Sequence, residues 1–156
     1  MTVLQLSIFI ENKSGTLLKV LKLLKEAQIQ IIASTIADTL DYGIYRIICS
    51  NPTEAYKILK ESGISVALSD VFAIRLNDQP GRAADAIELF SNEGISIAYM
   101  YSFLLGNHGI LVFRTDNAER AKEVIILNKL DFVADKNLAE VKEYAIKIEY
   151  FCNYSA

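Results

Sequence analysis

Two short stretches of the sequence combine residue types that can bind a carboxylate group, residues 12–17 and residues 78–83. In each stretch a glycine, Gly15 or Gly81, stands between an alternating apolar segment and an amphipathic segment. The first backbone N–H groups of a helix have no partner inside the helix, and the helix dipole favours a negative charge beside them. The pattern therefore predicts a ligand-binding loop that occurs twice in the chain; the alternative is an ordinary turn between a strand and a helix.

These two stretches belong to a longer internal repeat. When the sequence is aligned with itself at an offset of 66 residues, Gly15 falls on Gly81 and Gly43 falls on Gly109. The alignment needs no gap over residues 12–67, and the apolar positions keep the same spacing in both copies. Because matched glycines and matched apolar positions indicate matched structural roles, we expect two copies of one fold.

Each copy contains six predicted elements, identified from the period of its apolar residues. The first copy has strands at 4–10, 29–40, 44–49 and 64–68, and helices at 16–27 and from Asn51-Pro52 to Gly63. The second copy repeats this order with strands at 71–76, 95–104, 110–114 and 130–134, and helices at 83–90 and 118–125. An asparagine followed by a proline is typical of a helix start, because the asparagine caps the first turn.

The order of elements predicts the α+β fold class, with two ferredoxin-like βαββαβ units. In each unit an antiparallel sheet carries both helices on one face. We place the two domains at residues 1–69 and 70–144. Residues 145–156 form a C-terminal tail or an extra edge strand in this interpretation.

Three motifs make the chain similar to the ACT-domain family, specifically to small proteins that consist of two tandem ACT domains. The motifs are Asp-x-Pro-Gly at residues 78–81, Glu-Gly-Ile-Ser-Ile at residues 93–97, and the segment 36–46. The resemblance covers about residues 3–141 and implies a regulatory fold that binds a free amino acid. It further implies that the ligand lies between the first loop of one unit and the second strand of its neighbour, at an inter-domain or inter-subunit interface. The first copy departs from the motif, with Asn12 in place of the acid and Ser14 in place of the proline.

An α-amino acid offers three groups that these regions can bind. The carboxylate fits the N–H groups after the glycine, and the ammonium group fits Asp78 or the side-chain oxygen of Asn12. The second strand then contacts the side chain of the ligand. The ligand-binding residues expected on this basis are Asn12, Gly15, Thr16, Leu17, Ser34, Ile36 and Asp38 in the first copy, and Asp78, Gly81, Arg82, Ala83, Met100, Tyr101 and Ser102 in the second. Alternatively, Asp78 caps a helix or turn, and Arg82 is a solvent-exposed helix residue.

Composition argues against several other classes of protein. The chain has 156 residues, a net charge of −3 and a pI of about 5.2, so binding to nucleic acid or to a membrane surface is not expected. Cys49 and Cys152 are far apart, which favours reduced thiols and a cytoplasmic protein over a disulfide framework. The single histidine, His108, falls in a predicted turn without partners for catalysis or metal binding. We therefore expect no enzymatic activity, no cofactor and no metal.

Three functions are compatible with these features. The leading hypothesis is a sensor that binds a free amino acid and acts on a metabolic enzyme or another regulator; the sequence does not indicate which amino acid. The alternative is a ligand-free structural module that docks on a metabolic enzyme, because the first copy departs from the motif. The third function is RNA binding through Tyr99, Tyr101 and Phe103, which share one strand face. Alternatively, these aromatic residues are buried against the partner unit or a second chain. Because the strand at 95–104 is apolar on both faces, we also predict a homodimer.

Overall fold

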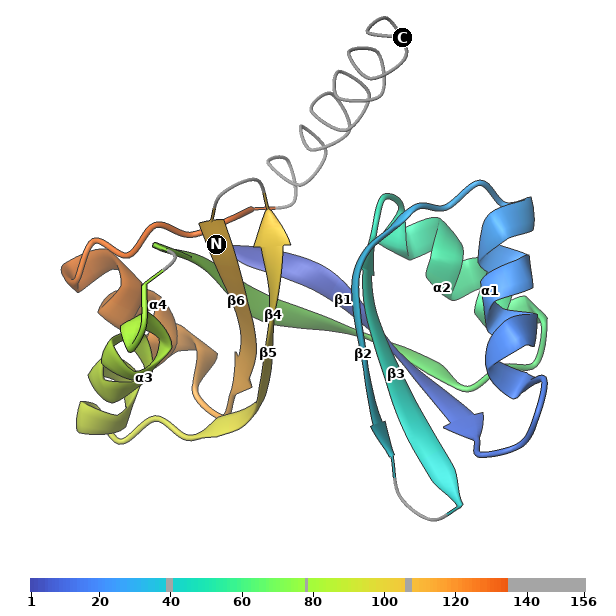
Figure 1. Cartoon of the computed structure of the whole chain (residues 1–156), viewed down its shortest axis with the longest axis horizontal. Helices are drawn as coiled ribbons and strands as arrows, with labels where there is room; N and C mark the ends of the chain where they lie inside the picture. Colours follow the sequence, from blue (N-terminus) through green and yellow to red (C-terminus); the bar gives the residue numbers. More distant parts are fainter. Residues whose placement is uncertain (39–40, 78, 106–107, 135–156) are drawn as a thin grey trace, which may run out of the picture. The chain divides into compact units, whose positions relative to one another are not determined.

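A computed structural model describes residues 1–38, 41–77, 79–105 and 108–134 of the chain (Figure 1). The chain forms two compact units. The first unit is Leu4–Asp70, and the second unit is Met1–Val3 together with the chain from Val71 onward. The two predicted copies are therefore described in turn, each as a unit of its own.

The first unit contains an antiparallel sheet with two helices on one face (Figure 1). Its elements are β1 (Thr2–Glu11), α1 (Thr16–Glu26), β2 (Ile31–Asp38), β3 (Tyr42–Cys49), α2 (Pro52–Glu61) and the start of β4 (Val66–Asn77). Strand β3 lies between β1 and β2 and pairs antiparallel with both, so that Ile8 is opposite Tyr45 and Tyr45 is opposite Ile36. This is the predicted order of elements, and it brings the ends of β1 and β2 to the same edge of the unit.

Alternating residues of β1 and periodic residues of both helices form the core of the first unit. Leu6 and Ile8 from β1 are fully buried against Val20 and Leu24 from α1 and Leu59 from α2. The spacing of four residues between Val20 and Leu24 places both on the same helix face. Burial of large aliphatic side chains of this kind contributes about 1.5–3 kcal/mol each to folding.

The second unit repeats this arrangement along the remainder of the described chain. After β4 come α3 (Arg82–Asn92), β5 (Ile97–Leu105), β6 (His108–Thr115) and α4 (Ala118–Leu127), with the strands in the order β4-β6-β5. The fourth predicted strand, at 130–134, occurs as a single bridge between Ile74 and Phe132, beside a hydrogen bond of 2.8 Å from Val133 N to Ala73 O. The predicted tail at 145–156 lies outside the described residues.

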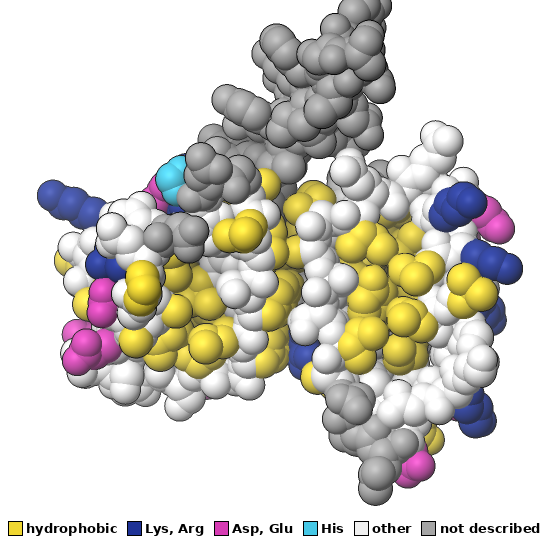
Figure 2. Space-filling model, in the orientation of Figure 1, with side chains coloured by type: hydrophobic (Ala, Val, Ile, Leu, Met, Phe, Trp, Pro, Cys, Tyr) yellow, Lys and Arg dark blue, Asp and Glu magenta, His cyan; other side chains and the backbone are white. Residues whose placement is uncertain are grey.

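Aromatic packing distinguishes the core of the second unit. The ring of Phe113 on β6 stacks on Phe72 at 5.5 Å between centroids and contacts Phe90 of α3 at 4.9 Å. In each unit, hydrophobic side chains also reach the surface between the helices and the sheet (Figure 2). The helices therefore leave part of the apolar surface of each sheet uncovered.

The helices begin in two different ways. Asn51 Oδ1 accepts a hydrogen bond of 3.2 Å from Glu54 N at the start of α2, and Asn117 Oδ1 accepts one of 3.1 Å from Arg120 N at the start of α4. The cap predicted at Asn51 is thereby confirmed. By contrast, α1 and α3 begin after a glycine, and no side chain caps them within the described residues.

Candidate functional site

The two glycine loops have the same backbone geometry. Gly15 and Gly81 have φ angles of 89° and 87°, in the left-handed region that residues with a side chain rarely adopt. The two loops share a backbone hydrogen bond, from Thr16 N to Lys13 O at 3.3 Å and from Arg82 N to Gln79 O at 3.4 Å. Since no described side chain caps either helix, both loops present helix N–H groups of the kind that bind anions.

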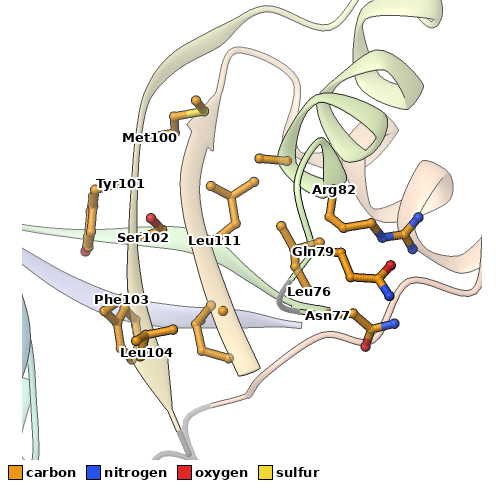
Figure 3. Close-up of a pocket in the computed structure, with 13 residues that line it drawn as sticks. Leu76, Asn77, Gln79, Arg82, Met100, Tyr101, Ser102, Phe103, Leu104 and Leu111 are labelled. Carbon is orange, nitrogen blue, oxygen red and sulfur yellow. The ribbon is translucent and has the colours of Figure 1, made fainter. Parts of the chain in front are cut away.

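A cavity of about 410 Å³ lies beside this loop in the second unit (Figure 3). It is bordered by the start of α3 and by strands β4, β5 and β6, through Leu76, Asn77, Gln79, Arg82, Ala83, Met100, Tyr101, Ser102, Phe103, Leu104, Gly109, Ile110 and Leu111. Its volume is at the lower end of the range for small-molecule sites. The cavity can therefore hold a ligand the size of a metabolite.

The cavity lies on the helix-covered side of the sheet. Ser102 of β5 is directly opposite Leu111 of β6, and Leu111 belongs to the core beneath the helices. Residues directly opposite one another share a sheet face, and alternation places Met100 and Leu104 on that face with Ser102. In Figure 3 the Tyr101 side chain points away from Leu111. The floor of the cavity is therefore formed by Met100, Ser102, Leu104 and Leu111.

This floor is apolar and partly open to solvent. Met100 is 53% exposed and Leu104 is 73% exposed, although both are large hydrophobic residues. Arg82 is the charged side chain among the described residues that line the cavity, and its guanidinium group donates a hydrogen bond of 3.1 Å to Asp85. In Figure 3 that guanidinium group points away from β5. The chemistry of the site is thus an apolar floor beside the N-terminus of a helix.

In the first unit, side chains fill the corresponding space. A Cβ atom placed on Gly43 would lie 3.3 Å from Ile10 Cγ1, 3.4 Å from Asn12 Oδ1 and 3.6 Å from Ile36 Cγ2. At the matching Gly109, the nearest described atom to such a Cβ is the backbone oxygen of Leu76 at 3.9 Å. The side chains of Ile10, Asn12 and Ile36 therefore crowd Gly43 in the first unit, and no described side chain comes as close to the Cβ position of Gly109 in the second.

The structure brings together most of the predicted residues of the second copy. Five of them line the single cavity, namely Arg82, Ala83, Met100, Tyr101 and Ser102. Gly81 directly precedes α3, and Asp78 lies outside the described residues. Sequence reasoning did not identify Leu104 or Leu111 as lining residues. The alternation of β5 and its register with β6 are the signals that point to them.

The predicted residues of the first copy are spread over different surfaces. Thr16 lines a cavity of about 420 Å³ with Phe9 and Tyr42, and Gly15 lines a shallow hollow along α1. Leu17 packs against the core. Neither of these cavities includes the exposed β2 residues Ser34 and Ile36. Asp38 is the last residue of β2, where its backbone is opposite Gly43. Asn12 lies beside Gly43, as described above.

Other reactive groups offer little chemistry in the described part of the chain. Cys49 is buried, which raises the pKa of its thiol to about 11 and disfavours the reactive thiolate. His108 is exposed and is the first residue of β6, so its predicted place in the turn is wrong: its backbone pairs with Leu105 and Asn77 in the sheet. Residues 1–38, 41–77, 79–105 and 108–134 contain no group of His, Cys, Asp and Glu side chains suited to a metal ion. None of the helices in these ranges has the length and apolar character needed to cross a bilayer.

Comparison with known proteins gives a consistent picture. Residues 1–142 match the family described as the ACT domain pair. The crystal structure of protein BT0572 from Bacteroides thetaiotaomicron is similar, with 40% identity, a TM-score of 0.84, and coverage of 89% of this chain and 96% of that chain. No match was found among curated protein sequences.

More distant structures share the fold. The ligand-free regulatory subunit of aspartate kinase from Thermus thermophilus is 15% identical, with a TM-score of 0.55 over 80% of this chain and 90% of that chain. The corresponding subunit from Thermus flavus is also 15% identical, with a TM-score of 0.57 over 88% of this chain and 91% of that chain. At this level of identity, the comparison supports the tandem arrangement of the fold and leaves the ligand open.

Proposed function

The chain belongs to the ACT domain pair family, and we propose that it is a non-enzymatic cytoplasmic regulator that binds a free amino acid in the cavity of its second unit. The ACT domain pair is a regulatory module, and regulatory subunits of aspartate kinase share its fold. The observation that carries the proposal is the open cavity beside Gly81, where a helix N-terminus meets an apolar floor. An amphiphilic zwitterion matches both parts of that surface.

The ligand carboxylate binds N–H groups of the first turn of α3 in this proposal. A negative charge at a helix N-terminus gains about 0.3–2 kcal/mol from the helix dipole. The ammonium group is bound by Asp78 and by backbone carbonyl groups of the neighbouring strand, and charge-assisted bonds of this kind contribute about 1.5–3 kcal/mol. The side chain of the ligand then extends over β5, towards Met100 and Ser102.

We propose one ligand for each chain, bound in the second unit, because Ile10, Asn12 and Ile36 crowd the matching strand glycine of the first unit. Asn12 and Ile36 lie over Gly43, so a ligand there must displace both side chains. The departure of Asn12 from the family motif and its position in the structure therefore support the same conclusion.

We also propose a homodimer that covers β5. This strand is at the edge of the second unit, in the order β4-β6-β5, and it carries the exposed side chains of Met100 and Leu104. An exposed apolar edge strand favours pairing with another chain. A second copy at this edge shields the apolar floor of the cavity from water.

A thermal shift assay with each of the twenty amino acids at millimolar concentration tests the proposed function. A ligand that binds the folded state raises the melting temperature, by an amount that corresponds to about 2.7 kcal/mol at 100 times its Kd. Gly81→Val should abolish the shift, because valine strains a backbone with φ of 87° and moves the helix N-terminus. Gly15→Val is the matched control, with the same strain at φ of 89°, and should retain the shift.

The second candidate is a ligand-free module that docks on a metabolic enzyme. The crowding of Gly43 by Ile10, Asn12 and Ile36 favours it, because it leaves less room for a ligand in one of the two units. Under this alternative, affinity purification recovers a stable enzyme partner without added amino acid, and none of the twenty amino acids changes the melting temperature. A ligand-dependent shift that Gly81→Val removes would contradict it.

A further inference from the structure

We infer that the amino acid bound in the second unit has an uncharged, unbranched or γ-branched aliphatic side chain about the length of leucine or methionine. This inference rests on the proposed function and specifies the class of ligand. It follows from the apolar floor of the cavity, from the charges around it and from the space above Ser102.

The floor presents apolar surface that gains from being covered. Met100 and Leu104 are 53% and 73% exposed, and they flank Ser102 on the same face of β5. Leu111 continues this surface onto β6, directly opposite Ser102. An aliphatic side chain laid across these residues removes apolar surface on both partners from water, which favours binding.

The described charges give no partner to an ionised side chain. The guanidinium group of Arg82 is bonded to Asp85 and points away from β5 (Figure 3). At the position of Leu104, the aligned residue of the first copy is Asp38, so the second copy has an apolar residue where the first has a carboxylate. Moving an ammonium or carboxylate group onto this floor costs solvation without a compensating ion pair.

The small side chain of Ser102 determines the length of the ligand. Its aligned residue in the first copy is Ile36, whose Cγ2 atom lies 3.6 Å from the Cβ position over Gly43. In the second unit the smaller serine borders the cavity, which extends from the helix start to β6 among the described residues. The cavity takes the γ and δ atoms of the ligand, in the place that the isoleucine side chain fills in the first unit.

Isothermal titration of the full chain with a homologous series tests the inference. In the series alanine, norvaline and norleucine, affinity should rise about fourfold for each added methylene. Lysine and norleucine share a four-carbon chain and differ by the terminal ammonium group, so lysine should bind at least about tenfold more weakly. Glutamate and norvaline share a three-carbon side chain, so this pair provides the corresponding comparison for a carboxylate.

The variant Leu104→Asp makes the test more specific, because it places on the cavity floor the aspartate that the first copy has at the aligned position, Asp38. Because Leu104 is exposed, the variant should fold; norleucine affinity should fall about tenfold or more, and the difference between lysine and norleucine should narrow. Leu127→Asp is the control, since Leu127 is 75% exposed and does not line the cavity. It should leave norleucine affinity unchanged.

The possible outcomes separate the inference from the proposed function. If none of the twenty amino acids or their analogues binds, the proposed function fails. If lysine or glutamate binds more tightly than norleucine, or if Leu104→Asp leaves norleucine affinity unchanged, the ligand class is wrong and amino-acid binding stands. Tight norleucine binding supports both the proposed function and the ligand class if Leu104→Asp weakens it and Leu127→Asp does not.

Discussion

At Gly43 in the first unit and at Gly109 in the second, the same strand position faces different surroundings. A Cβ atom placed on Gly43 would have three side chains within 3.6 Å, whereas the nearest described atom to a Cβ on Gly109 is a backbone oxygen at 3.9 Å. The loops themselves are alike, with φ angles of 89° at Gly15 and 87° at Gly81. Under the proposed function, a glycine turn before a helix is therefore not sufficient for a binding site, and the residues opposite the helix start decide whether a ligand has room.

The two units also differ beside the aligned residues Phe9 and Arg75, and here it is the first unit that has the open cavity. Phe9 N donates to Ser65 O at 2.9 Å, and the aligned Arg75 N donates to Asp131 O at 2.6 Å. In the second unit the side chains of Arg75 and Asp131 also form an ion pair at 3.1 Å, whereas Phe9 and Ser65 border the open 420 Å³ cavity of the first. The two units thus share this backbone hydrogen bond, and each has a cavity on a different side.

The largest expected effect compares the two cores. Leu24 and Phe90 are aligned in the repeat, and both are buried. Phe90→Ala should reduce the free energy of unfolding by about 3–5 kcal/mol and Leu24→Ala by about 2–5 kcal/mol, because each leaves a cavity in packed surroundings. Urea unfolding followed by circular dichroism measures both. A loss below about 1 kcal/mol for Phe90→Ala would contradict the aromatic core around Phe113.

The next prediction transfers the blocking residue from one unit to the other. Ser102→Ile places on β5 the residue that the first copy has as Ile36, and it should weaken amino-acid binding by about 100-fold, which corresponds to about 2.7 kcal/mol. Because Ser102 is an exposed strand residue and isoleucine favours strands, the variant should remain folded. Titration calorimetry measures the loss. Ser34→Ile, on the aligned strand of the first unit, is the control and should bind normally.

Much of the fold was predictable because its signals are local. The apolar periods of residues 4–10 and 16–27, together with the Asn51-Pro52 helix start, depend on neighbouring residues in the chain. The second-unit site was predictable in part, since Arg82 and Ser102 follow from the loop and the next strand. The crowding of Gly43 was not predictable, because it depends on how the side chains of Asn12 and Ile36 pack beside this glycine from two other strands or strand ends. Packing of this kind is set by strand register and rotamer, which a single sequence does not specify.

A smaller effect distinguishes the ends of the aligned strands β3 and β6. Burial raises the pKa of the Cys49 thiol from 9.0 to about 11, whereas the aligned residue is Thr115, which does not titrate. The neutral thiol stabilises the folded state below pH 9, and that stability is lost as the pH rises through about 11. Over this window the free energy of unfolding should fall by up to about 1.4 kcal/mol per pH unit more than in Cys49→Ala. Urea unfolding at pH 8 and pH 10 provides the comparison, and parallel pH dependence in the two proteins would contradict the burial of the thiol.

The smallest expected effect concerns the helices that begin in the same way. Asn51 and Asn117 are aligned, and each accepts a hydrogen bond from the backbone N–H three residues later, at 3.2 and 3.1 Å. Replacing either with alanine leaves that N–H group without its cap and should cost about 1 kcal/mol in the free energy of unfolding. Chemical denaturation of Asn51→Ala and Asn117→Ala measures both costs, and Asn51→Ser and Asn117→Ser should recover most of the loss because serine also caps helices. Neither alanine variant should change amino-acid affinity, since both caps lie outside the cavity. Equal costs at the two caps, together with a ligand response lost in Gly81→Val and kept in Gly15→Val, would show that the two units differ in ligand binding and not in how α2 and α4 begin.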